Sequence, residues 1–253
     1  MPALLFPLLA AWLALATLPA GAAAQFTLKT PEGTEIPVAA AGDGARLLLW
    51  LPSESGITAG DREAAARLAQ RGFTVWLPDL HGAHFLAPVP SAMDQLPPAE
   101  VAALIRRAAA ERDAVVLVAG ERGAILALEG AERFRATAPP EAAARLRGAI
   151  LLSPNFYRAT PEPGRDPEYV VAVSRNRLPV AVVQPAMSPW YWYVDELKAR
   201  LARNGAPVFV FYLQGVRDRF HFRDDALATE HDMAARLPAV IESAWKKIEG
   251  QGQ

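Results

Sequence analysis

Cysteine is absent from all 253 residues, so neither a disulfide nor a lipid-modified cysteine is available to this chain. An excess of charge is missing too, because 26 Lys and Arg residues stand against 27 Asp and Glu residues. A formal net charge of −1 gives no electrostatic reason to expect a nucleic acid or an anionic membrane as partner. No internal repeat or long low-complexity tract is present. These absences predict a single globular domain whose stability comes from its hydrophobic core, without disulfides.

Charged side chains are also missing from the start of the chain. Residues 3–18 carry none, and the small residues 22–24 follow them. This pattern is typical of a secretory signal peptide that is cleaved after Ala24. Retention as a membrane anchor is the alternative, but two prolines and a glycine interrupt the apolar span. We expect residues 1–24 to be removed and residues 25–253 to form a soluble periplasmic or secreted protein with no anchor.

Short apolar runs alternate with segments of helical periodicity along the rest of the chain. The runs predict strands over 26–29, 35–40, 46–51, 73–77, 114–119, 148–152, 179–184 and 207–212. The periodic segments predict helices over 62–72, with Asp61 as the cap, and over 98–112, 123–134, 194–204 and 225–248. Such alternation favours an α/β fold with a mostly parallel sheet of about eight strands and helices on both faces. The first two strands form a hairpin, and residues 161–168 form a surface loop in place of a cap domain.

One corner of the sequence has the layout of a catalytic turn. The segment "AVVLVAGERGAILALEG", residues 114–130, runs from a strand through a glycine-flanked turn into a helix. Ligands of parallel sheets bind beyond the carboxyl ends of the strands, which is where this turn would lie. No serine, cysteine or aspartate stands at its apex, so the turn lacks the usual nucleophiles.

The order of these elements resembles the α/β-hydrolase fold over nearly the whole predicted mature chain. In that family the nucleophile is the third residue of a Gly-x-Ser-x-Gly turn between a strand and a helix. The matching turn here is Ala119-Gly120-Glu121-Arg122-Gly123, which puts Glu121 at the nucleophile position. A shift of one residue would put Arg122 there instead. We favour Glu121, because that register keeps Gly123 where the strand and the helix approach closely.

The resemblance also implies positions for the rest of a catalytic triad. His221 follows the last strand, where the family has its histidine, and Ser188 occupies the position of the acid. Asp218 is the carboxylate that could reach the Ser188 loop, although this is not the family's arrangement. The loop that would carry the oxyanion hole contains Pro52, which lacks an N–H donor, and Glu54, whose charge would oppose an oxyanion. The resemblance therefore implies a degenerate triad of Glu121, His221 and Ser188.

Two roles are open for Glu121. It could be a carboxylate nucleophile, as the aspartate is in haloalkane dehalogenases and epoxide hydrolases. The favoured role is a buried or half-buried ion pair with His221 or Arg122, because a helix N-terminus stabilises the anion and lowers its nucleophilicity. A relocated nucleophile is a further alternative, and four serines near strand ends are candidates: Ser53, Ser55, Ser153 and Ser188.

Four consecutive aromatic residues in "SPWYWY", residues 188–193, form a second local anomaly. They predict either a binding surface that includes Trp190 and Trp192 or a lid packed over the site. His81 and His84 with Asp79 resemble a metal pair, but a third reliable ligand is missing, so we expect neither a metal nor a cofactor.

The sequence thus predicts an exported protein of the α/β-hydrolase fold that has lost ester hydrolysis. It would bind a small-molecule ligand or an exported partner protein in the former active-site cleft. Five residues are the candidates for contacting it: Ser53, Glu54, Arg122, Trp190 and Trp192. The alternative is an active esterase that uses Glu121 and His221, or a relocated serine. A third hypothesis is a purely structural accessory protein whose aromatic loop docks into a larger assembly.

Overall fold

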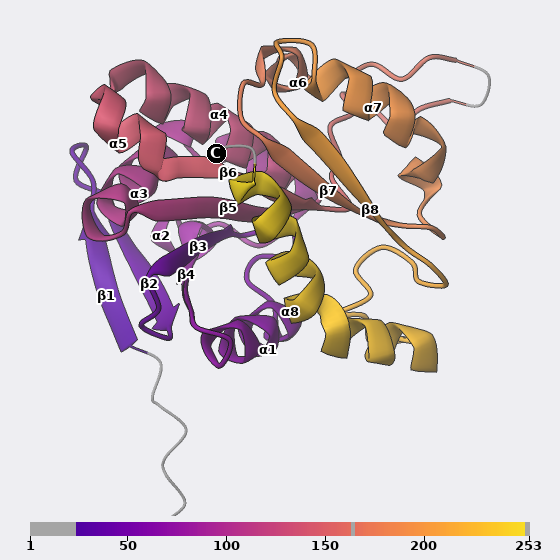
Figure 1. The fold of residues 1–253 in the computed structure, drawn as a ribbon, viewed down its shortest axis with the longest axis horizontal. Coiled ribbons are helices and arrows are strands. Elements are labelled where there is room, and N and C mark those ends of the chain that lie inside the picture. Colours follow the sequence, from indigo (N-terminus) through magenta and orange to yellow (C-terminus); the bar gives the residue numbers. More distant parts are fainter. Residues whose placement is uncertain (1–23, 163–164, 251–253) are drawn as a thin grey trace, which may run out of the picture.

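The apolar runs of the sequence form the strands of one twisted sheet (Figure 1). The computed structural model describes residues 24–162 and 165–250. The strands are β1 Ala24–Lys29, β2 Glu35–Ala41, β3 Arg46–Leu51, β4 Phe73–Pro78, β5 Ala114–Gly120, β6 Leu146–Leu152, β7 Val180–Pro185 and β8 Val208–Leu213. Their order across the sheet is β1-β2-β4-β3-β5-β6-β7-β8. β2 is antiparallel to β1 and β4, and all other neighbours are parallel, so the predicted sheet and its N-terminal hairpin are confirmed.

Helices connect these strands and lie on both faces of the sheet (Figure 1). The longer ones are α1 Ala59–Ala69, α3 Pro98–Glu111, α4 Gly123–Thr137, α7 Val194–Leu201 and α8 Ala228–Glu249. The shorter ones are α2 Leu80–Ala83, α5 Pro140–Arg145, α6 Val171–Arg175 and the 3-10 turns η1 Pro90–Gln95 and η2 Pro189–Tyr193. Five or six residues are too few to show a helical period, which is why the sequence did not predict α5 and α6.

The core consists of two layers, because successive side chains of a strand point to opposite faces. In β3, Leu47 and Leu49 pack in one cluster with residues of α3 and α4. Leu48 and Trp50 pack in the other cluster with residues of α1 and α8. Both faces of the strand are therefore buried, which explains its unbroken apolar sequence.

The start of α1 differs from the prediction. Thr58, not Asp61, is the N-cap residue, and its hydroxyl accepts a bond from the Asp61 N–H at 3.2 Å. Asp61 Oδ2 accepts the Thr58 N–H at 2.8 Å in return, which completes a capping box. The helix thus begins three residues earlier, since the acid occupies its first turn.

β8 is the last strand of the sheet, and its outer edge pairs with no strand in the described part of the chain. The carbonyls of Pro207 and Leu213 accept N–H groups of Val180 and Ala186 on the β7 side. The backbone groups of successive strand residues alternate in direction, so Val208, Val210 and Tyr212 direct their N–H and C=O groups toward the free edge.

Much of the predicted signal peptide lies outside the described residues, and so do residues 163 and 164 of the predicted 161–168 loop. The described residues of that loop contain no helix or strand. Within the described ranges, no helix combines the length and the apolar character that crossing a membrane requires.

Candidate functional site

The corner after β5 is a tight turn with Glu121 at its apex. Glu121 has a left-handed backbone with φ of 49°, which a residue other than glycine adopts only where its surroundings hold it. A Cβ atom on Gly123 would lie 2.4 Å from the Pro52 carbonyl oxygen, so only glycine fits there. The turn and the β3 loop therefore approach each other closely, and the geometry agrees with the register that puts Glu121 at the nucleophile position.

The partner of Glu121 is Arg219, so the prediction of an ion pair with His221 or Arg122 is wrong in its partner. Arg219 Nε donates to Glu121 Oε1, and Arg219 Nη2 donates to Glu54 Oε1 at 2.5 Å. Arg219 follows β8 and has a left-handed backbone with φ of 62°. The loop after β8 thus carries one guanidinium between two acids from separate loops, while Arg122 and His221 contact other residues.

Burial makes the charges of this cluster interdependent. Glu54 and Glu121 are each only 9% exposed, whereas the Arg219 side chain is 39% exposed. Burial raises the pKa of the Glu121 carboxyl, the hydrogen bond from Arg219 opposes this rise, and the nearby Glu54 adds to it. The Oε2 atoms of both glutamates are buried without a hydrogen-bond partner in the described structure. Arg219 is therefore the group that keeps two buried carboxylates together.

His221 lies near the corner but does not contact Glu121 through a hydrogen bond. Its Nε2 atom is 3.0 Å from Oδ1 of Asp61 on α1, and both side chains are buried. The ring packs edge-on against Phe220 and Phe222, with centroid distances of 5.2 and 4.8 Å. One ring nitrogen of His221 is thus bonded to a carboxylate 160 residues away in the sequence, and the other, Nδ1, is buried without a partner in the described structure.

Ser188, the residue predicted at the acid position, is hydrogen-bonded to Asp218, the carboxylate that was expected to reach its loop. Ser188 Oγ lies 3.0 Å from Asp218 Oδ2, and the Ser153 hydroxyl donates to Oδ1 of the same carboxylate. Burial raises the pKa of Asp218, and the two hydroxyl bonds lower it. Asp218 therefore links the loops after β6 and β7 and does not orient His221.

Ser53 of the β3 loop uses its polar groups in hydrogen bonds within the loop. The Ser53 N–H donates to the Gly56 carbonyl at 3.3 Å, and Ser53 Oγ accepts the Ser55 N–H at 3.1 Å. Ser53 is buried, and the only charged residue of the loop, Glu54, is bound to Arg219. The Ser53 N–H is thus already used and does not point to an oxyanion.

The cavity at the corner is very small. Glu121, Ser153, Arg219 and His221 all line it, yet its volume is about 20 Å³. A cavity needs about 10–15 Å³ to hold one water molecule. The corner therefore has room for a single water and not for an ester substrate.

Three of the predicted ligand contacts, Arg122, Trp190 and Trp192, do not line the cavity at the corner. Arg122 binds Asp94 at 3.0 Å and lines a separate cavity of about 260 Å³ beside α4. The Trp190 ring packs on Tyr157, with a centroid distance of 4.9 Å, so it is not presented to solvent as a free face. Trp192, by contrast, is 83% exposed.

Asp79 and His84 of the β4 loop bind different partners, and neither ring nitrogen of His81 has a hydrogen-bond partner in the described structure. Asp79 caps α2 by accepting the Gly82 N–H at 2.8 Å, and His84 Nε2 lies 2.8 Å from Glu100 Oε2. His81 is buried, and burial lowers its pKa. Among the residues that the structure describes, no three such side chains are grouped to hold a metal ion.

The comparisons with known proteins concern the fold. The sequence matches no known family profile and no curated protein. Among solved structures, a hyperthermophilic esterase from Pyrobaculum calidifontis is 15% identical, with a TM-score of 0.64 over 89% of this chain and 84% of that chain. Esterase 2 of Thermogutta terrifontis, phosphoramylated by tabun, is 15% identical, with a TM-score of 0.60 over 88% and 94%. A bacterial heroin esterase is 15% identical, with a TM-score of 0.63 over 90% and 86%.

These neighbours, with the strand order and the turn after β5, show that the chain has the α/β-hydrolase fold. The central residue of the corner was missed from the sequence. Arg219 stands in "VRDRFHF", where two arginines flank Asp218, and this charge pattern was the one available signal. Nothing local in the sequence marks Asp61 as the partner of His221.

Proposed function

We propose that this chain is an exported, non-hydrolytic protein of the α/β-hydrolase fold that binds a partner protein beside the former active-site corner. One observation carries the proposal: the guanidinium of Arg219 lies between Glu121 and Glu54 and leaves about 20 Å³ at the apex. A site that hydrolyses an ester needs an activated nucleophile and room for the acyl group. This corner has a carboxylate already neutralised by an arginine, and space for about one water.

The lack of space also favours a partner protein over a small-molecule ligand at this corner. The surface beside it is formed by Met187, Tyr191, Trp192 and Tyr212, which we call the aromatic surface. Met187 is 55% exposed, and the Tyr191 ring contacts Tyr212 at a centroid distance of 5.5 Å. Exposed aromatic and Met side chains are enriched at protein interfaces. Ser188 ties this surface to the corner through Asp218.

One observation favours the second candidate, an active esterase with a relocated serine. Ser153 follows β6 with a left-handed backbone, φ 46°, and its hydroxyl donates to the buried carboxylate of Asp218. Strained backbones occur at active sites, and a carboxylate is able to accept a hydroxyl proton. No hydrogen bond joins Ser153 to a histidine in the described structure: His221 Nε2 bonds to Asp61, and its Nδ1 has no partner.

Hydrolysis of p-nitrophenyl acetate distinguishes the two candidates. The non-hydrolytic protein gives no turnover above buffer. Turnover that Ser153→Ala abolishes would identify Ser153 as a relocated nucleophile. Turnover lost in Glu121→Gln or His221→Ala would identify Glu121 and His221 as the catalytic residues. Either result would replace the proposal with an esterase.

The proposed binding of a partner protein is tested by crosslinking in the cell that exports the chain. A photo-crosslinking amino acid at position 192 is expected to give one discrete crosslinked product. The same probe at Leu227, which is 49% exposed and lies outside the aromatic surface, is the matched control. Products of equal yield at both positions, or none at position 192, would contradict a partner at the aromatic surface.

A further inference from the structure

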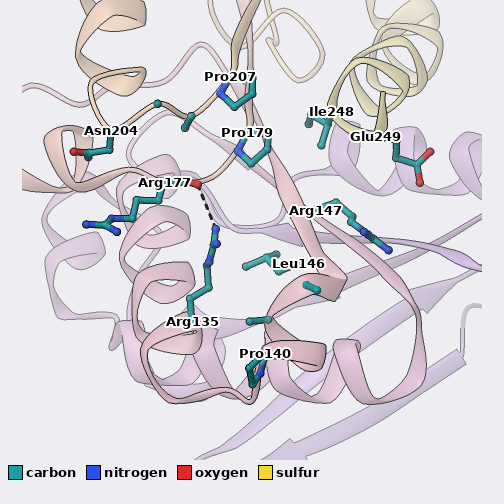
Figure 2. Close-up of a pocket in the computed structure, with 14 residues that line it drawn as sticks. Arg135, Pro140, Leu146, Arg147, Arg177, Pro179, Asn204, Pro207, Ile248 and Glu249 are labelled. Carbon is teal, nitrogen blue, oxygen red and sulfur yellow. Dashed lines mark hydrogen bonds between the residues drawn. The ribbon is translucent and has the colours of Figure 1, made fainter. Parts of the chain in front are cut away.

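A large groove lies at the end of the sheet opposite to the corner (Figure 2). Leu146, Pro179 and Pro207 line it at the amino ends of β6, β7 and β8, and Ile248 closes it from the end of α8. Its volume is about 880 Å³, against about 20 Å³ at the corner. The groove thus has the size of a small-molecule site, for which about 300–1,000 Å³ is usual.

The charge of this groove is opposite to that of the whole chain. Arg135, Arg147 and Arg177 line it, and Glu249 is the one acid among its lining residues. All three arginines are exposed, and none forms an ion pair with a carboxylate of the described residues. The groove therefore carries three arginines against one acid among the residues that line it.

The arginines lie on two sides of the groove. Figure 2 shows Arg135 and Arg177 on one side of Leu146 and Arg147 on the other. Arg135 Nη1 donates to the Arg177 carbonyl at 3.3 Å, and Arg147 Nη2 donates to the Asp113 carbonyl at 3.3 Å. Each bond uses one of the five N–H donors of its guanidinium and fixes its position at the rim.

We propose that this groove binds a small organic polyanion with at least two carboxylate or phosphate groups. Guanidinium groups bind both kinds of anion through paired N–H bonds, which accounts for arginine at the rims. Two separated rims require two separated anionic groups, and the apolar floor of Leu146 and the prolines accommodates a carbon frame between them. This site is independent of the corner and of its proposed partner.

Isothermal titration with citrate and with inorganic pyrophosphate, at equal ionic strength, tests the site and distinguishes carboxylates from phosphates. We expect saturable binding of one probe with one site per chain. Arg147→Gln and Arg177→Gln should each weaken binding at least about tenfold, because each removes a charged hydrogen-bond donor. Arg67→Gln, an exposed arginine of α1 that is paired with Glu63, is the control and should leave the affinity unchanged.

Because the replaced arginines are exposed, the variants should keep the melting temperature of the unaltered protein, and this measurement excludes misfolding as the cause of weaker binding. Absence of saturable binding of both probes at millimolar concentration would overturn the proposal. Equal weakening by Arg67→Gln would also overturn it, because the binding would then reflect general surface charge. If hexaglutamate binds and neither citrate nor pyrophosphate does, the proposal of a small ligand is overturned and the groove is assigned to an acidic peptide.

Discussion

Arg219 is the residue on which the stability of the corner depends. Replacement by methionine would leave Glu54 and Glu121 facing each other, both nine-tenths buried and without a cation. Removing one partner of a buried ion pair costs about 3–5 kcal/mol. We therefore expect Arg219→Met to lower the free energy of unfolding by that amount in urea titrations at pH 7.

Glu121→Ala should cost less than Arg219→Met. Arg219 keeps Glu54 as a partner and reaches water, so the loss is nearer the roughly 1–3 kcal/mol of an unsatisfied polar group. Arg122→Met, which breaks a pair with the exposed Asp94, is the control and should cost about 1 kcal/mol or less. Equal costs for Arg219→Met and Arg122→Met would show that the buried acids do not depend on their cation.

Serine at position 121 should not restore hydrolysis. In Glu121→Ser the hydroxyl would stand at the apex, but His221 Nε2 is bound to Asp61 and no carboxylate orients the ring from the Ser188 position. Glu54 would still oppose an oxyanion. We expect no turnover of p-nitrophenyl acetate above the wild-type level. Strong activity in this variant would mean that the apex residue was the only missing part.

At the scale of elements, one buried acid holds the loop that carries Arg219 and His221. Glu230 on α8 accepts the Arg217 N–H at 3.0 Å and the Leu227 N–H at 2.8 Å, and it binds the Arg217 guanidinium at 2.6 Å. The bond from the Arg217 side chain is the main cause that lowers the pKa of Glu230 to about 2. Both ends of the loop therefore depend on one carboxylate.

The stability that Glu230 supplies should depend on pH in a defined direction. Its folded pKa of about 2 lies below the ordinary 4.5, so its contribution is complete above about pH 4.5 and is lost as the pH falls toward 2. Glu230→Gln should destabilise by about 1.5–3 kcal/mol at pH 7 and by much less near pH 2.5, in urea titrations. Glu196→Gln, in an exposed pair with Arg200, should show little difference at either pH.

The elements were predictable and their long-range pairs were not. The apolar run of β5 and the glycine after it determine a strand, a turn and a helix locally. Only glycine fits at position 123, because a Cβ there would lie 2.4 Å from the Pro52 carbonyl oxygen of the β3 loop. Glu121 and Arg219 are 98 residues apart, and Asp61 and His221 are 160 apart. Their pairing depends on how the strand order brings loops together, and no local spacing in the sequence encodes it.

At the scale of the whole molecule, the predicted signal peptide would determine where the mature chain begins. Cleavage after Ala24 would leave Gln25 as the first residue, within β1, whose pairing with β2 joins Gln25 to Ala39. Intact-mass measurement of the exported protein should therefore give residues 25–253. A mass that includes residues 1–24 would instead indicate a retained anchor.

The free edge of β8 has a consequence for the behaviour of concentrated solutions. The strand Val208–Leu213 reads VFVFYL, without the lysine, proline or bulge that usually prevents edge-to-edge pairing. Copies of the chain are therefore expected to associate reversibly through this edge as the concentration rises, which light scattering will detect as an increasing mean mass. Tyr212→Lys, at a position that is 43% exposed, should keep the protein monomeric, whereas Lys29→Ala at the opposite edge of the sheet should not. A second copy could therefore add its own β8 to the sheet at this edge, so the protein is best stored at low concentration.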